Sequence, residues 1–144
     1  MKKGKVFIII LLCVILIGLL LALILHPKIH PGYQISNIHS IAIISSVYDG
    51  EIEDSEKQVP FIEFIESLEL RDIGFYKFPN MSADVYMRLL DEEGNTVYEL
   101  RFYGGGGLID ASSSQEPRYY IGQEKLEQLF SMLEVAHRWE KTVK

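Results

Sequence analysis

The sequence predicts an α+β protein in which an N-terminal transmembrane helix precedes one small domain, an antiparallel sheet with two helices packed on one face. An unbroken apolar run precedes the domain, and later stretches alternate with the period of a strand or repeat at helical spacing. The expected divisions are a cytoplasmic N-terminus (1–5), a transmembrane helix (6–25), a stalk (26–34) and an extracytoplasmic domain (35–144).

The apolar run from Val6 to Leu25 contains no charged residue, and Gly18 is its only member outside the hydrophobic set. As a helix it is about 30 Å long, the thickness of the hydrocarbon core of a bilayer. Lipid offers no partner to backbone N–H and C=O groups, so a helix is the expected conformation. The alternative, a core helix, requires a larger domain than this chain provides.

The basic residues around this run predict its orientation. Lys2, Lys3 and Lys5 precede it, whereas Lys28 alone follows closely. Basic flanks stay in the cytoplasm, so the domain is expected outside the cell membrane. The run exceeds the roughly 7–15 residues typical of a cleaved signal peptide, which favours an uncleaved signal-anchor over cleavage.

Charge and cysteine content exclude several classes of function. The whole chain has a formal net charge of -6, and all of its acidic residues follow residue 25. An acidic domain lacks the basic surface that nucleic-acid binding requires, so we expect no nucleic-acid partner. The single cysteine, Cys13, excludes an intrachain disulfide framework and a multi-cysteine zinc site. No cofactor is expected.

The stalk is short and carries two prolines and a glycine. Its nine residues reach at most about 30 Å, which holds the domain close to the membrane. His26 and His30 lie four residues apart and His39 follows, a spacing that raises the possibility of a metal site. A proline follows each of the first two histidines and prevents the helix that would align them, so we expect no metal there.

The first half of the domain is expected to contain one strand and one helix. Residues 38–48 are β-branched and apolar, which predicts a strand buried on both faces, and residues 49–56 are expected to form a polar loop. A helix then follows, capped by Ser55 with Pro60 in its first turn. Its predicted buried residues are Phe61, Ile62, Ile65 and Leu68, and its predicted solvent-exposed residues are Glu63, Glu66 and Glu69.

The second half is expected to contain a hairpin, further strands and a final helix. Residues 84–90 and 96–103 alternate around the turn at 91–95, a typical hairpin pattern. Short strands are expected at 108–110 and 118–121. The last helix opens at Gly122, and its apolar repeat comprises Leu126, Leu129, Phe130, Leu133 and Ala136.

Four consecutive glycines, Gly104–Gly107, are the most distinctive motif of the domain. No helix start, Lys or Ser/Thr follows them in the arrangement that a phosphate loop requires. They are expected to form a bend or bulge between strands, where glycine permits positive φ. A second interpretation is that their bare backbone lets another chain approach closely.

A ligand or partner surface is predicted around these glycines, because tyrosine and arginine suit recognition surfaces. The tyrosines equally suit the strands of a small sheet, which is the simpler explanation. The residues of the predicted surface are Tyr103, Gly104, Gly105, Gly106, Gly107, Arg118, Tyr119 and Tyr120.

The sequence contains no recognisable catalytic motif. Ser112–Ser114 and His137 offer a nucleophile and a base, but no motif joins them, and no catalytic or metal-binding residue is assigned.

The sequence resembles small secreted or membrane-anchored extracytoplasmic proteins of Gram-positive bacteria that carry domains of unknown function. The resemblance covers about residues 35–137. It rests on the segments Ile41–Ser46, Asp91–Asn95, Leu100–Gly104, Leu108–Asp110 and Tyr119–Gly122. It implies an extracytoplasmic α+β domain and brings no catalytic residue.

The expected function is a noncatalytic binding or accessory module, anchored in the lipid bilayer through residues 6–25, with a possible protein partner at the cell envelope. Two alternatives are an envelope enzyme or metal-dependent protein, and a membrane subunit that acts through its helix.

Overall fold

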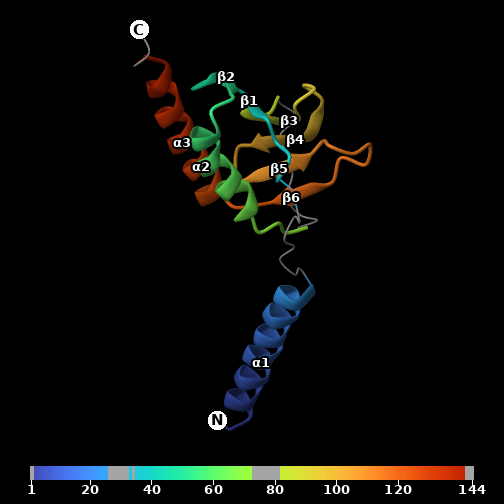
Figure 1. Cartoon of the computed structure of the whole chain (residues 1–144). Helices are drawn as coiled ribbons and strands as arrows, with labels where there is room; N and C mark the ends of the chain where they lie inside the picture. The colour runs from blue at the N-terminus through green and yellow to red at the C-terminus, as the bar shows by residue number, and fades with distance from the viewer. Residues whose placement is uncertain (1, 26–32, 34, 73–81, 142–144) are drawn as a thin grey trace.

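The computed structural model describes residues 2–25, 33, 35–72 and 82–141, which form an α+β structure of three helices and six strands (Figure 1). The elements are α1 (Lys2–Leu25), β1 (Ser40–Ser45), β2 (Asp49–Ile52), α2 (Ser55–Glu66), β3 (Val85–Leu90), β4 (Thr96–Tyr103), β5 (Gly107–Asp110), β6 (Arg118–Tyr120) and α3 (Gln123–Lys141).

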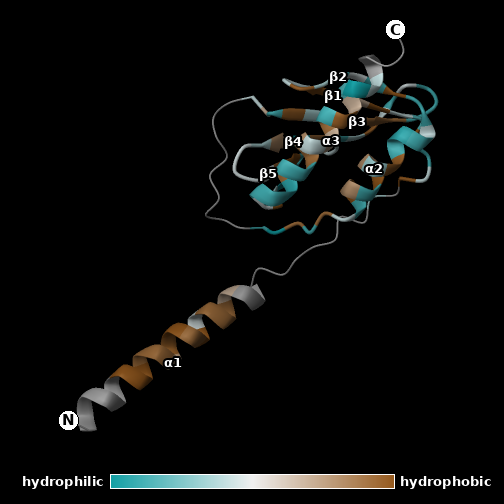
Figure 2. Ribbon diagram, turned by 90° about the vertical axis from the view of Figure 1, so that its left-hand side faces the viewer, coloured by the Kyte–Doolittle hydropathy of each residue, from teal (hydrophilic) through white to brown (hydrophobic). Residues whose placement is uncertain are grey.

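Helix α1 extends away from the domain (Figures 1 and 2). The helical conformation expected for residues 6–25 is confirmed, and the helix begins earlier, at Lys2. Over the residues that the structure describes, no helix meets the combined length and apolarity of a membrane span. A membrane crossing by residues 6–25 therefore stays a prediction from the sequence.

The six strands form one antiparallel sheet in the order β2-β1-β3-β4-β5-β6. Four of its five adjacent pairs are joined directly along the chain. The exception is β1 with β3, which become neighbours because the connection through α2 brings the chain back beside β1. The expected antiparallel sheet is thus confirmed, with more strands than the sequence indicated.

The core lies between one face of the sheet and two helices. Side chains from β1, β3, β4 and β5 alternate onto this face, which we call the helix face, and α2 and α3 cover it (Figure 1). Phe64 of α2 packs against Phe102 of β4 with ring centroids 6.1 Å apart. The fully buried side chains of this core include Ile41, Ile43, Phe61, Ile65, Met87, Leu89, Leu100, Leu108, Leu129 and Leu133.

Strand β1 differs from the expectation of a strand buried on both faces. Ile41 and Ile43 are fully buried, whereas Ile44 is 53% exposed. The reason is that helices cover only the helix face of this antiparallel sheet. The strand is also shorter than residues 38–48, because a turn closes at Ser45, whose hydroxyl oxygen accepts the N–H groups of Val47 and Tyr48.

The prediction of a polar loop at residues 49–56 is wrong for its first half, which forms strand β2. Gly50 and Ile52 pair with Ile43 and Ile41 of β1. Only Ile52 is buried, and Asp49 and Glu51 are exposed at the edge of the sheet. Charged side chains are common on edge strands because they discourage pairing with another chain.

The start of α2 also differs from the expectation. Asp54, rather than Ser55, caps the helix, since its Oδ1 accepts the N–H of Glu56 at 3.0 Å. Pro60 lies inside the helix rather than in its first turn. Phe61, Ile65 and Leu68 are buried as predicted, and Ile62 is only half-buried.

Two local predictions are confirmed. The alternating stretches form the hairpin of β3 and β4, with a register shift between Leu89 and Leu90. The final helix begins at Gln123 and buries Leu126, Leu129, Leu133 and Ala136, whereas Phe130 is half-buried.

Candidate partner surface

The glycines form the tight turn between β4 and β5. Gly105 and Gly106 have φ values of 81° and 89°, a region that side-chain-bearing residues rarely adopt. The N–H of Gly106 donates to the carbonyl of Tyr103 at 3.2 Å, and Gly107 begins β5. The expected bend between strands is confirmed.

This turn packs against the start of α3. A Cβ on Gly106 would lie 2.4 Å from the carbonyl carbon of Gly122 and 2.7 Å from the N atom of Gln123. The carbonyl of Gly106 accepts the N–H of Ile121 at 2.8 Å, and the side chain of Gln123 accepts the N–H of Gly105 at 3.1 Å. At Gly106, the chain that approaches the bare backbone is therefore the protein's own.

Strand register divides the predicted surface between the two faces of the sheet. Gly107 pairs with Tyr103 on one side and with Tyr120 on the other, so these three residues form one row. Arg118 lies two residues from Tyr120 on the same face, which is opposite α2 and α3 and which we call the open face. Tyr119 pairs with Leu108 and lies on the helix face.

The open face also carries an ion-pair network that sequence reasoning missed. Glu99 of β4 bonds to Arg88 of β3 at 3.3 Å and to Arg101 at 2.7 Å, and Arg101 reaches Glu116 at 3.6 Å. The hydrogen bond from Arg101 to Glu99 raises the pKa of this guanidinium. The signal was present in the alternation of β3 and β4, which places these polar side chains opposite the apolar ones.

A second, smaller apolar cluster lies beside this network. It contains Ala83, Tyr103 and Ile109, with Tyr86 packed against them. The hydroxyl of Tyr86 accepts the N–H of Ala83 at 3.2 Å. The open face thus combines tyrosine, arginine and a few apolar side chains, and no described helix covers it.

Tyr33, near the end of the predicted stalk, docks on the helix face. Its hydroxyl donates to Oδ2 of Asp110 at 3.0 Å, and its ring meets that of Tyr98 edge-on with centroids 4.9 Å apart. Burial, and then the negative charge of Asp110, raises the pKa of Tyr33. Burial raises the pKa of Tyr119 too, with Asp110 and Asp72 adding to the shift. The domain is thereby fastened at the point where the chain enters it.

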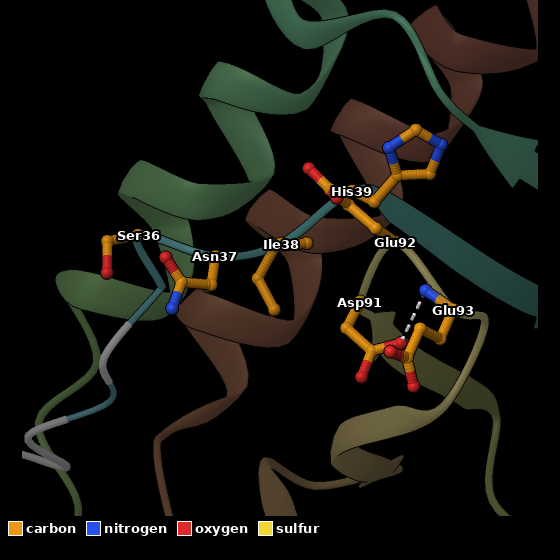
Figure 3. Close-up of a pocket in the computed structure, with 7 residues that line it drawn as sticks. All are labelled: Ser36, Asn37, Ile38, His39, Asp91, Glu92 and Glu93. Carbon is orange, nitrogen blue, oxygen red and sulfur yellow. Dashed lines mark hydrogen bonds between the residues drawn. The ribbon is translucent and has the colours of Figure 1, made fainter.

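An open pocket of about 510 Å³ lies between residues 36–39 and the β3–β4 turn (Figure 3). The carboxylate of Asp91 points into the turn, where it accepts the backbone N–H groups of Glu93 and Asn95 at 3.0 and 2.8 Å. These bonds, chiefly those from Asn95, lower the pKa of Asp91. The carboxylate therefore stabilises the turn.

Among the described residues, no group of three or more His, Cys, Asp and Glu side chains is placed to hold a metal ion. His39 lines the pocket of Figure 3. His26 and His30 lie outside the described residues.

Ser112 and His137 are far apart. Ser112 lies in the β5–β6 connection, where its hydroxyl bonds to Asp110 and accepts the N–H of Glu99 at 3.0 Å. His137 lies in α3, and in Figure 1 α3 and the β5–β6 connection lie on opposite sides of the domain. A nucleophile–base pair between them is not formed.

Comparison of the chain with models of protein families, with curated proteins and with solved structures finds no match. The resemblance to extracytoplasmic proteins of Gram-positive bacteria therefore stays a prediction.

Proposed function

We propose that this protein is a noncatalytic accessory module, anchored in the cell membrane by α1, that displays its domain outside the cytoplasm and binds a protein of the cell envelope. The observation that carries the proposal is the apolar surface of α1. Its large side chains from Ile8 to Leu21 are 50–63% exposed, on all sides of the helix. Such a surface is stable in lipid and unfavourable in water.

The distribution of lysines supports the orientation. Lys2, Lys3 and Lys5 belong to the first turns of α1, and the last turn carries no basic residue. An excess of lysine is typical of the cytoplasmic end of a membrane helix, which supports a domain outside the cytoplasm.

The open face is the proposed partner surface. Interfaces are enriched in tyrosine and arginine, and this face presents Tyr120 and Arg118 beside the pairs that Glu99 forms with Arg88 and Arg101. Glu99 already holds these two arginines in place, so a partner would meet a largely preorganised surface.

Site-specific photocrosslinking in intact cells tests the proposal. A photoreactive residue at Arg118, on the open face, should capture one defined envelope protein. The same residue at Glu127, exposed on α3, serves as the matched control and should not capture that protein. Equal capture from both positions, or none from Arg118, would count against the open face as the partner surface.

A helix exchange separates the domain from α1 as the acting part. Replacing residues 6–25 by an unrelated membrane span should leave the Arg118 crosslink intact, because α1 serves only as an anchor. Loss of the crosslink while the chain stays in the membrane would favour the alternative in which the helix itself binds the partner.

A further inference from the structure

A groove of about 430 Å³ lies where the end of α2, the segment after it, the end of β6 and the start of α3 meet. The residues that line it include Arg71 and Lys125, together with Ser67, Tyr120 and Glu69. In Figure 1 the end of α2 and the start of α3 lie at the end of the domain nearer α1. The groove lies at the β6 edge of the sheet and shares Tyr120 with the open face.

Among the described residues, Lys125 has uncharged partners only. Its Nζ donates to the hydroxyl of Ser67 at 3.1 Å and to Oε1 of Gln128 at 3.3 Å, and it lies 6.0 Å from the centre of the Phe64 ring. Within the described part of the chain no carboxylate lies within ion-pair distance of this ammonium group.

Arg71 is held by its backbone rather than by its charge. Its N–H and C=O both bond to Tyr120, at 3.0 and 2.8 Å, which adds one rung to the edge of β6. The residue is half-buried, and its guanidinium forms no ion pair with any described residue. The fork of donors is consequently available to a ligand.

These two cations contrast with others of the domain. Lys57, Arg88 and Arg101 each have a carboxylate partner. Acidic residues outnumber basic ones by 20 to 14 in the chain, so counter-ions are plentiful. Arg71 and Lys125 nevertheless line one groove, and neither has a carboxylate partner among the residues that the structure describes.

The start of α3 adds a weaker contribution of the same sign. Gly122 lines the groove, and α3 begins at the next residue, so the positive end of the helix dipole lies beside both cations. Two carboxylates act in the opposite direction, Glu69 in the lining and Glu124 in the first helical turn. Among the lining residues, the two basic ones outnumber the single acidic one.

We propose that this groove binds a phosphate group that carries an organic substituent. Arg71 supplies a planar fork that matches two phosphate oxygens, and Lys125 supplies a second positive charge. The groove has room for more than the phosphate itself, because pockets for small organic ligands begin at about 300 Å³. The phosphate belongs either to a soluble phosphate ester or to a lipid headgroup.

Titration of the full chain in detergent micelles with glycerol 3-phosphate tests this site. The backbone amide NMR signals of Gly122 and Gln123 should shift as the ligand is added, and the shift should saturate. Arg71→Gln and Lys125→Gln should each weaken binding about tenfold, the usual scale for losing one charge-assisted contact. Lys57→Gln removes the same charge from an exposed ion pair elsewhere and should leave binding unchanged.

Two further probes distinguish the sources of the phosphate. Inorganic phosphate should bind more weakly than the ester. The same amide signals are then compared in phosphatidylcholine nanodiscs with and without phosphatidylglycerol. Shifts that occur only with phosphatidylglycerol would identify the phosphate as that of a lipid headgroup. No saturable shift with any of these probes, or equal loss of binding in all three variants, would overturn the proposal. The titration in detergent does not depend on membrane orientation, so it can fail while the proposed function holds.

Discussion

At the scale of single residues, the stability of the domain depends on a few backbone positions with unusual demands. Gly106 combines a left-handed φ with contact to the backbone at Gly122 and Gln123. Gly94, in the β3–β4 turn, has a similar φ of 80° but open space around it. Substitution at Gly94 therefore measures backbone strain alone, whereas substitution at Gly106 adds a steric clash.

Gly106→Ala should destabilise the domain by about 2–4 kcal/mol, because the new Cβ clashes with backbone that has no room to move. Gly94→Ala should cost only about 1 kcal/mol, the price of the left-handed conformation. Thermal unfolding of the full chain in detergent, followed by near-UV circular dichroism, measures both. Equal losses would show that the start of α3 does not rest on the glycine turn.

Asp91 predicts a dependence of stability on pH. Its pKa is lowered in the folded state, so its contribution is complete above about pH 4, its ordinary range, and is lost as the pH falls through the lower folded value. Asp91→Ala should therefore be less stable than the unaltered chain at pH 7, and the difference should disappear in acid.

The control for this prediction is Glu92→Ala, which removes the same charge from the neighbouring residue without removing the bonds to Glu93 and Asn95. Urea unfolding midpoints between pH 7 and pH 2 supply the comparison. A difference between Asp91→Ala and the unaltered chain that stays constant down to pH 2 would contradict the assigned role of the carboxylate.

At the scale of elements, one buried side chain ties α2 to the sheet. Gln58 is 4% exposed, and its Nε2 lies within 2.7–3.1 Å of the carbonyl oxygens of His39, Ile52 and Glu53. These carbonyls belong to the entry of β1, the end of β2 and the connection to α2. Its two amide hydrogens are shared among these three acceptors.

Gln58→Ala should destabilise the domain by about 2–3 kcal/mol, because it removes the buried donor that these three carbonyls share. Gln115→Ala, in the exposed β5–β6 connection, should change stability by less than about 0.5 kcal/mol. Chemical denaturation of both variants measures the difference. A loss in Gln58→Ala no larger than in Gln115→Ala would refute this role of the amide.

The sequence predicted best the elements that bury one face, because their apolar residues then recur at a regular spacing. The hairpin of β3 and β4 and the repeat of α3 are of this kind. Strand β2 was missed because an edge strand buries little, and here only Ile52 is covered. Its acidic residues resemble a loop until its pairing with β1 is known.

The candidate surfaces were less predictable because they depend on contacts between distant segments. The glycine turn was located correctly, but its contact with Gly122 depends on how β6 leads into α3. Alternation within β6 separates Tyr119 from Tyr120, a signal too short to read in the sequence. The groove of Arg71 and Lys125 joins three elements and has no signature along the chain.

At the scale of the whole molecule, two parts with opposite surfaces share one chain. Helix α1 exposes its apolar side chains and is brown along most of its length in Figure 2, whereas most of the large apolar side chains of the domain are buried. Tyr33 fastens the domain to the chain that leads from α1. The proposed function assigns a separate role to each part, with α1 as the anchor and the open face as the partner surface.

The measurement that tests this account most directly is the activity of a reporter enzyme fused after Lys144, chosen because it works only outside the cytoplasm. The full chain should give an active reporter in the membrane fraction, and deletion of residues 6–25 should abolish the activity while the fusion is still made. An inactive reporter on the full chain, or equal activity with and without residues 6–25, would contradict the proposed anchor and its orientation.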